Sequence, residues 1–448
     1  MNTLPLLPSA LTTHTIAYRN ARPVSQAEFL CDVLALAARL PNTGHVFNLC
    51  KDRYWFAVSL FAAISRGILS LLPNSTAPQN VADLRDEVPD VVCLGDQTTL
   101  TFSNIPYVHV PDVGQATYSV APVMPQIPFD QRIACMYTSG STGKPQAHSA
   151  TFWRMRKCAI VEAERMWMTT GGPCAVLGTV PSQHMFGLEA TLLLPIFGGG
   201  LFSARLPFFP ADVVSALAEL PEPRLLVTTP FHLRKLMDAD IEIPAVAAVL
   251  SATAPLALEL ARAVEARLGT PVVEFYGSTE TGALATRRTA VQGEWETYPG
   301  IVLSQDQGVT VAAAAHFERP QVLTDVLELR SQSSFRLLGR HSDMINVVGK
   351  RSSLAFLNQL ITSLPGVEDG VFCVHECDTG NDAARLVAFV VAPERGSAEI
   401  LAALRLHVDP VFLPRPIVFV DSLQRDGNGK VPATVMTALI AEHLPQGS

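Results

Sequence analysis

Apolar residues recur along the chain with two different periods. Residues 26–40, 54–66 and 211–220 carry them at the three- and four-residue spacing of helices. Between such segments lie short apolar runs typical of buried strands. These runs cover residues 45–49, 91–94, 107–110, 132–137, 175–178, 225–228, 247–250 and 272–275. Strands that alternate with helices predict an α/β fold with largely parallel sheets, in which ligands bind beyond the carboxyl ends of the strands.

The pattern changes near residue 340, which predicts a second domain. A β-rich segment over 308–338 comes before this point, and a separate α/β pattern of about a hundred residues follows it. Its predicted elements are helices near 353–363 and 397–407, strands near 371–375, 385–392 and 416–420, and a final helix. We therefore expect a large domain over residues 1–339 and a small, mobile α/β domain over 340–448.

The composition is that of an enzyme-like globular protein, with 48% hydrophobic and 17% charged residues in a chain of 448. A net charge of −8 and scattered basic residues argue against nucleic-acid binding. The 8 cysteines form no CxxC pair, so we expect reduced thiols in a cytoplasmic protein. The N-terminus has no basic region, and no apolar run suits a bilayer span, so we expect no stable membrane insertion.

The most informative segment is residues 137–145, which read YTSGSTGKP. Glycines let backbone N–H groups turn toward an anion, while hydroxyls and an ammonium group add donors. The spacing differs from a Walker A loop, which has four residues before Gly-Lys and a Ser or Thr after it. A polar Ser/Gly loop would also explain this stretch taken alone. The alternative is a cradle for nucleotide phosphates made by Thr138, Ser139, Gly140, Ser141, Thr142, Gly143 and Lys144.

A second polar segment, Tyr276 to Gly282, follows the predicted strand 272–275. Its aromatic ring can stack on a base, its hydroxyls can donate to phosphate, and its one carboxylate can hold Mg²⁺, a cation that prefers oxygen ligands. A strand end with a polar turn is the simpler interpretation of this segment by itself. Together with the first segment, it favours a nucleotide site at the strand ends.

Four weaker features each have an ordinary structural explanation as well. The small residues at 251–255 could lie along a planar base, or form a turn that leads into a helix. Asp325 could accept from a ribose diol and Arg340 donate to it, although a single Asp most often caps a turn. Lys430 follows Gly-Asn-Gly in a loop, where most lysines are solvated. His184 is a lone histidine, which is more often packed than catalytic.

Taken in this order and spacing, the motifs resemble those of the adenylate-forming superfamily, which includes acyl- and aryl-CoA synthetases, peptide-synthetase adenylation domains and luciferases. The resemblance covers most of residues 25–445. It implies layered αβ subdomains and a β subdomain in the large domain. It also implies an ATP- and Mg²⁺-dependent acid–thiol ligase, which adenylates a carboxylic acid and passes the acyl group to a phosphopantetheine thiol of coenzyme A or an acyl carrier protein.

The resemblance also implies the role of each site residue. Tyr276 would stack on adenine, Thr279 would bind the α-phosphate, Glu280 would hold Mg²⁺, and Lys430 would cross the cleft. The implied catalytic residues are Lys430, Thr142, Glu280 and His184. The implied ATP site adds Ala252, Gly277, Ser278, Asp325 and Arg340 to the phosphate loop, Tyr276 and Thr279. The implied substrate pocket consists of His184, Met185, Ala252, Phe275 and Gly277, and the implied thiol path of Gly349 and Arg351.

The chain departs from the family pattern in three places. The segment between Gly282 and Asp325 is short, so we expect a trimmed β subdomain. The hinge position is Ser342, where Asp or Lys is usual, and Gln424 stands where a proline is common. The first two departures bear on how readily the small domain rotates, and not on the chemistry.

The substrate is the least determined feature. The compact N-terminal half, with segments 48–54 and 71–74, looks like the short synthetases of aryl-polyene and related pigment or lipid clusters. This resemblance favours an aromatic acid such as a hydroxybenzoate. A medium- or long-chain or β-hydroxyacyl fatty acid is the main alternative. An adenylating enzyme that forms amides, or an inactive nucleotide-binding homologue, would also fit the motifs.

Overall fold

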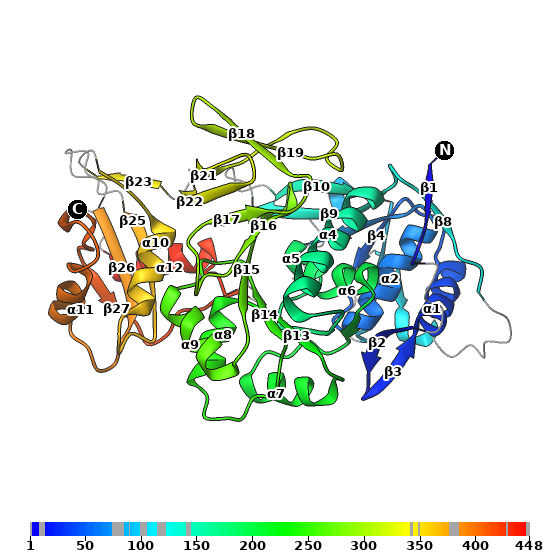
Figure 1. Ribbon diagram of the computed structural model, residues 1–448, viewed down its shortest axis with the longest axis horizontal. Helices are drawn as coiled ribbons and strands as arrows, with labels where there is room; N and C mark the ends of the chain where they lie inside the picture. Colours follow the sequence, from blue (N-terminus) through cyan, green and yellow to red (C-terminus); the bar gives the residue numbers. More distant parts are fainter. Residues whose placement is uncertain are drawn as a thin grey trace.

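Two large sheets and a small C-terminal unit make up the computed structural model (Figure 1). The small unit, here called the C-terminal unit, comprises the described part of residues 344–444. The structure describes residues 2–8, 14–73, 85–88, 90–98, 105–113, 122–139, 145–340, 344–347, 350–375, 385–426 and 429–444.

The first sheet is parallel apart from one edge hairpin. In sheet order its strands are β10 (Pro145–Thr151), β9 (Arg132–Ser139), β5 (Leu69–Leu72), β4 (His45–Asn48), β6 (Val91–Gly95) and β7 (Tyr107–His109), with only β10 antiparallel to its neighbour. Helices α1 (Gln26–Arg39) and α2 (Arg53–Ser65) share its core. Ser25 and Glu28 form a capping box at the start of α1, and Asp52 caps α2.

The second sheet carries the motifs. Its central strands are parallel: β15 (Val272–Ser278), β14 (Ala248–Ser251), β13 (Arg224–Thr228), β11 (Ala175–Gly178), β12 (Leu201–Ser203) and β2 (Thr15–Arg19). Beyond β2 lies β3 (Arg22–Ser25). Beyond β15 the sheet continues in antiparallel pairs through β16 (Gly282–Arg287), β17 (Trp295–Thr297), β22 (Ser334–Arg340) and β21 (Asp325–Leu329).

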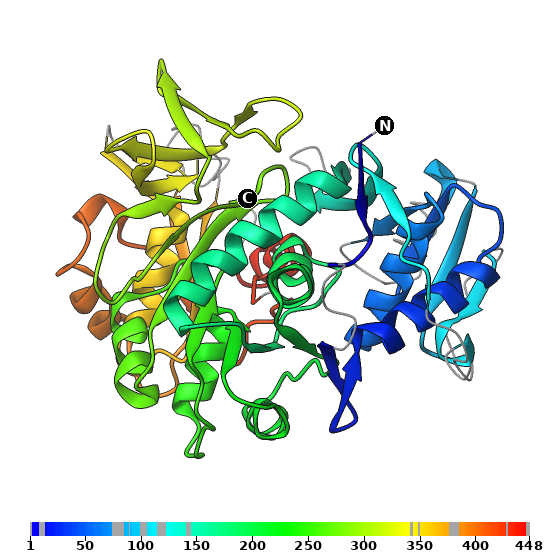
Figure 2. The ribbon, with the colours of Figure 1, turned by 45° about the vertical axis from the view of Figure 1, so that its right-hand side comes forward.

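Helices cover both faces of this sheet. Successive strand residues point to opposite faces, so Leu226 packs toward α7 (Pro210–Glu219), α8 (Pro230–Asp238) and α9 (Leu258–Leu268), while Leu225 packs toward α4 (Phe152–Thr170) and the helical segment 185–198. Figure 2 shows α4 as the long teal helix that crosses the centre of the molecule. Helix α4 was not among the predicted elements, because Arg154 and Glu162 interrupt the apolar pattern of its buried face.

A smaller sheet of β18 (Val302–Asp306), β19 (Val309–Ala313) and β20 (Gln321–Val322) occupies the segment expected to hold a trimmed β subdomain. The C-terminal unit combines the hairpin β23 (Met344–Val347) and β24 (Lys350–Ser353) with a second sheet of β25 (Asp369–His375), β26 (Arg385–Val391) and β27 (Ile417–Phe419). Its helices are α10 (Leu354–Ser363), α11 (Ser397–Leu404) and α12 (Ala433–His443).

The C-terminal unit has its own apolar core, in which Leu357 of α10 packs with Ala388 of β26 and Leu404 of α11. The α/β fold prediction is confirmed, whereas a domain boundary at residue 340 and mobility of the small unit stay predictions. The hairpin of β23 and β24 was not predicted. Strand β15 runs on to Ser278, so Tyr276 belongs to the strand rather than to the loop after it. Within the described residues, no helix is both long and apolar enough to span a membrane.

Candidate active site

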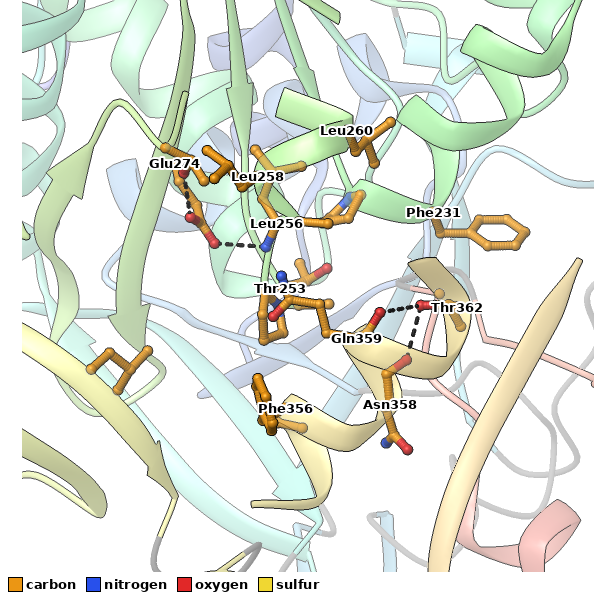
Figure 3. A pocket seen from close by; sticks show the side chains of 18 of the residues that line it. Phe231, Thr253, Leu256, Leu258, Leu260, Glu274, Phe356, Asn358, Gln359 and Thr362 are labelled. Carbon is orange, nitrogen blue, oxygen red and sulfur yellow. Dashed lines mark hydrogen bonds between the residues drawn. The ribbon is translucent and has the colours of Figure 1, made fainter. Parts of the chain in front are cut away.

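A cleft of about 1410 Å³ separates the end of the second sheet from the C-terminal unit (Figure 3). The large-domain wall consists of the segment 253–258, the end of β15 and parts of β21 and β22. The opposite wall comes from α10, the start of β25 and the segment that carries Lys430. Motifs separated by more than a hundred residues in the sequence therefore meet at one opening.

Tyr276 and Asp325 form a buried pair on the large-domain wall. The Tyr276 hydroxyl donates to Asp325 Oδ2 over 2.7 Å. The rings of Trp295 and Phe335 hold the tyrosine, with centroids 5.5 and 5.3 Å away. The register of β21 and β22 places Asp325 opposite Arg340, the two residues predicted to bind ribose.

Glu274 positions the loop of small residues at 252–256, and the sequence motifs did not identify it. Its buried carboxylate accepts from the Leu256 amide (3.0 Å) and the Thr289 hydroxyl (2.7 Å), and it pairs with Arg287 Nη2 (2.7 Å). Within the loop Thr253 has φ 78°, a conformation rare for a β-branched residue. Such strain persists only where the surroundings hold the backbone in place.

The turn from Ser278 to Gly282 is internally braced. The Ser278 amide donates to Thr281 Oγ1 (3.1 Å), and the Thr281 amide donates back to Ser278 Oγ (3.3 Å). The Glu280 carboxylate lies 3.4 Å from His148 Nε2 on β10, the strand that follows the predicted phosphate loop. The turn is therefore adjacent to β10 in space.

Two buried carboxyl groups lie beneath this turn. Glu162 of α4 and Glu189 of the segment 185–198 are 1% and 0% exposed, and among the described residues no hydrogen-bond partner reaches the Glu162 oxygens. Burial raises the pKa of both carboxyls, and for Glu189 the neighbouring Arg154 cation opposes this shift. A Cβ atom on Gly282 would lie 2.4 Å from Glu189 Oε1, so the turn rests directly on this pair. Arg154 Nη2 also donates to the Thr279 carbonyl over 3.2 Å.

His184 stands beside the predicted substrate pocket as a neutral imidazole. Burial and, to a smaller extent, the Lys430 ammonium group lower its pKa to about 4, and Asp426 opposes them. Lys430 lines the cleft together with Tyr276 and Asp325. The rings of Phe186 and Phe275 meet nearby at 5.2 Å.

The other predicted pocket residues differ in what they do. Met185 and Ala252 are buried like Phe275. Gly277 has a structural requirement, because a Cβ atom there would come within 2.2 Å of the Gly282 carbonyl oxygen. The close pairing of β15 and β16 therefore needs a glycine at this position.

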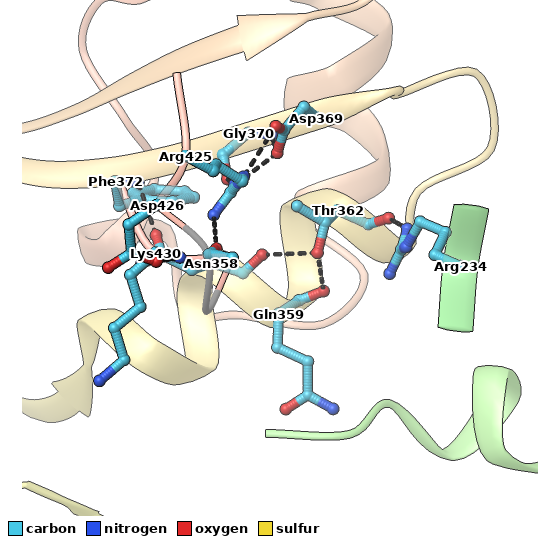
Figure 4. A network of polar contacts seen from close by, with 11 residues as sticks. Arg234, Asn358, Gln359, Thr362, Asp369, Gly370, Phe372, Arg425, Asp426 and Lys430 are labelled. Carbon is cyan, nitrogen blue, oxygen red and sulfur yellow. Dashed lines mark hydrogen bonds and ion pairs between the residues drawn. The ribbon is translucent and has the colours of Figure 1, made fainter. Parts of the chain in front are cut away.

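The segment that carries Lys430 is held by two acidic side chains (Figure 4). Asp426 Oδ1 accepts from the Lys430 amide over 2.9 Å, and the Asp426 amide donates to the Lys430 carbonyl over 2.8 Å. Arg425 forms a two-pronged ion pair with Asp369 of β25 (2.5 and 2.9 Å) and donates to the Gly429 carbonyl (2.7 Å). The lysine backbone is thus fixed to the C-terminal unit.

Several predicted site residues lie outside the described residues: Gly140, Ser141, Thr142, Gly143, Lys144, Ser342 and Gly349. For Thr138, Ser139, Arg340 and Arg351 only the backbone is described. The predicted phosphate loop, hinge and thiol path therefore stay predictions. Among the residues that are described, no three His, Cys, Asp or Glu side chains gather to hold a metal. One carboxylate such as Glu280 together with substrate phosphates is a usual set for Mg²⁺.

The protein therefore has an α/β architecture in which motif residues meet in a cleft beside the C-terminal unit. The chain matches the AMP-binding enzyme family over residues 12–314 and belongs to that family. It is 29% identical over 276 residues to a 4-coumarate–CoA ligase of Rhodobacter capsulatus, covering 62% of this chain and 67% of that one. It is 22% identical to an indoleacetate–CoA ligase of Aromatoleum aromaticum, over 94% of each chain.

Solved structures share the fold. An o-succinylbenzoate CoA synthetase of Bacillus subtilis in complex with its acyl-adenylate has a TM-score of 0.81 at 18% identity, over 100% of both chains. MatB of Rhodopseudomonas palustris with bound ATP has a TM-score of 0.80 at 17% identity, over 97% of both. The predicted membership of the adenylate-forming group and its fold are therefore confirmed.

Proposed function

We propose that this chain is an AMP-forming acid–thiol ligase. One observation carries the proposal: Lys430 lines the same cleft as Tyr276 and Asp325. Membership of the AMP-binding enzyme family and relatives named as CoA ligases support it.

In the first half-reaction an oxygen of the substrate carboxylate attacks the α-phosphorus of ATP. The bond to the β-phosphate breaks, and pyrophosphate leaves with the bonding electrons. Tyr276 and the loop at 252–256 would hold the adenine, and Asp325 with Arg340 the ribose. The Lys430 ammonium group would stabilise the charge that develops at phosphorus, a contact typically worth about 3–4 kcal/mol. Thr279 and the predicted loop from Thr138 to Lys144 would add donors to phosphate.

Mg²⁺ on Glu280 would neutralise phosphate charge when bound. In the second half-reaction the C-terminal unit would turn about Ser342 and bring Gly349 and Arg351 to the cleft. The thiol sulfur attacks the acyl carbonyl, its proton passes to solvent, and AMP leaves.

For the substrate, we favour an aromatic carboxylic acid such as a hydroxybenzoate. The tilted rings of Phe186 and Phe275, with centroids 5.2 Å apart, would suit a flat ring beside His184, Met185 and Ala252. Relatives named for 4-coumarate, indoleacetate and 4-chlorobenzoate point the same way. A fatty acid is the alternative, since a putative long-chain fatty acid–CoA ligase of Staphylococcus haemolyticus is 22% identical. Coenzyme A is the favoured acceptor, and an acyl carrier protein is the other.

The test is pyrophosphate release by the purified protein with ATP and Mg²⁺ across a panel of aromatic and aliphatic acids. Release with one class of acid identifies the substrate class. We expect Lys430→Ala to lower release at least about a hundredfold, because a charge-stabilising contact is lost. Arg405→Ala, which removes an exposed cation of the C-terminal unit outside the cleft, is the control and should keep full activity. Nucleotide binding without release for any acid would contradict the proposal.

A further inference from the structure

Helix α8 makes close contacts with the C-terminal unit, including the segment that carries Lys430, although the two are far apart in the sequence. Arg234 Nη1 of α8 donates a hydrogen bond to the Thr362 carbonyl in the last turn of α10 (Figure 4). A Cβ atom on Gly429, next to Lys430, would lie only 2.8 Å from Phe231 Cβ on the first turn of α8. Two parts of the C-terminal unit therefore dock on one helix of the large domain.

At the end of α10 the Leu364 amide donates to the Ile361 carbonyl (3.3 Å) and the Ser363 hydroxyl donates to the Leu360 carbonyl (2.7 Å), whereas the Thr362 carbonyl accepts from Arg234. The last turn of α10 contains no basic residue, and the residue that ends it is Leu364 in extended conformation rather than a glycine. The last carbonyls of a helix have no partner inside the helix, and they carry partial negative charge. Arg234 supplies both a donor and a positive charge to this end, and it does so from the other side of the cleft.

The contact continues to the catalytic lysine through charged groups. Asp369 attracts the Arg234 guanidinium group and is itself paired with Arg425, whose charge opposes the attraction. Asp238, one turn further along α8, also attracts it. Arg425 also donates to the Gly429 carbonyl. The ion pair of Asp369 and Arg425, which acts on the Arg234 charge, therefore also fixes the backbone before Lys430.

We propose that Arg234 is a positioning residue for adenylation: it docks the C-terminal unit on α8 in the arrangement that aims Lys430 into the cleft. This inference rests on the proposed ligase function. Thiol transfer, in the mechanism proposed above, uses a different arrangement of the C-terminal unit, in which the contact with Thr362 is broken. Arg234 should therefore assist the first half-reaction and leave the second unassisted.

The test measures the two half-reactions separately in full-length enzyme. ATP–pyrophosphate exchange reports adenylation, and transfer from a synthetic acyl-adenylate to coenzyme A reports the second step. We expect Arg234→Gln to slow exchange about tenfold, the loss typical of one hydrogen bond with a charged donor, while transfer keeps its rate or rises. Arg234→Lys, which keeps the charge, should recover part of the exchange rate.

The chain offers a matched control in Arg267 of α9. It donates to the carbonyls of Met237, in the last turn of α8, and of Ala239 and Ile241 just beyond it, all within the large domain (2.7 to 2.9 Å). Arg267→Gln should change both half-reactions equally or not at all. The inference is overturned if Arg234→Gln also affects them equally, or affects neither.

A measurement without turnover separates this inference from the ligase proposal. Amide hydrogen exchange in α10 and in residues 425–431 should quicken in Arg234→Gln and stay unchanged in Arg267→Gln. Unchanged exchange in Arg234→Gln would refute the docking role even in a protein that adenylates no acid. Conversely, quickened exchange without any pyrophosphate release would leave docking supported and the ligase proposal refuted.

Discussion

Single side chains in the cleft combine a binding role with a fixed conformation. Tyr276 is 7% exposed and sits against Trp295 and Phe335, with its hydroxyl on Asp325. A ring held in this way needs no reordering when a base stacks on it. Its hydroxyl in turn orients the carboxylate predicted to accept from ribose, so one hydrogen bond links the two side chains predicted to contact adenine and ribose.

We expect Tyr276→Phe to raise the KM for ATP about five- to tenfold, because one buried hydrogen bond to a carboxylate is lost and Asp325 is less well oriented. The kcat should change less, since the ring remains. Steady-state pyrophosphate release at varied ATP measures both. Tyr298→Phe is the control: this tyrosine is also buried, but its hydroxyl has no hydrogen-bond partner among the residues that the structure describes. An unchanged KM in Tyr276→Phe would refute the ribose role of Asp325.

Among the elements, the junction of β15 and β16 brings the motifs together. The turn from Ser278 to Gly282 joins these strands, rests on Glu189, and meets His148 of β10 from the other large sheet. Glu280 remains 42% exposed in its side chain at this junction. Contacts with both large sheets therefore fix the position of the Glu280 carboxylate, which is still accessible to a cation.

Glu280→Gln tests the proposed Mg²⁺ contact at this junction. The amide keeps the shape of the side chain but loses the negative charge that a hard cation prefers. We expect the Mg²⁺ concentration for half-maximal pyrophosphate release to rise about tenfold, with much of the maximal rate restored at high Mg²⁺. Glu296→Gln, an exposed carboxylate on β17, should leave the Mg²⁺ dependence unchanged. An unchanged dependence in Glu280→Gln would show that the cation is held elsewhere.

For the whole molecule, the buried pair of Glu162 and Glu189 links stability to pH. Burial raises the pKa of Glu189 to about 7, above the ordinary value of 4.5. Between these values the folded state keeps a proton that the unfolded state releases. The free energy of unfolding therefore falls as pH rises through this window, and the loss is complete above about pH 7.

We expect Glu189→Gln, which cannot ionise, to be more stable than wild type at pH 8 by about 1–3 kcal/mol. The difference should shrink to near zero at pH 5, where both side chains are neutral. Urea unfolding at several pH values measures it. Glu164→Gln, an exposed residue of the same helix α4, should run parallel to wild type. If Glu189→Gln also runs parallel, the carboxyl is charged in the folded state.

The sequence was sufficient for the α/β class, for eight strands of the two large sheets and for the family. These follow from local signals: apolar periodicity sets strands and helices, and glycine- and hydroxyl-rich turns are needed wherever backbone approaches phosphate. Prediction from the sequence failed where charged or polar side chains lie in buried elements. Helix α4 buries Arg154 and Glu162, and β15 runs through Tyr276 to Ser278 rather than ending before them.

Other features depend on contacts between distant parts of the chain, which no local pattern encodes. Glu274 holds the loop at 252–256, Glu189 supports the turn at Gly282, and Arg234 caps α10 across the cleft. Each is a single charged residue that no sequence motif identified. Glu274 contacts a backbone amide, Arg234 contacts a backbone carbonyl, and Glu189 lies against a glycine that has no Cβ atom. Groups of these kinds occur throughout the chain. Only the tertiary structure determines which of these groups each charged side chain contacts.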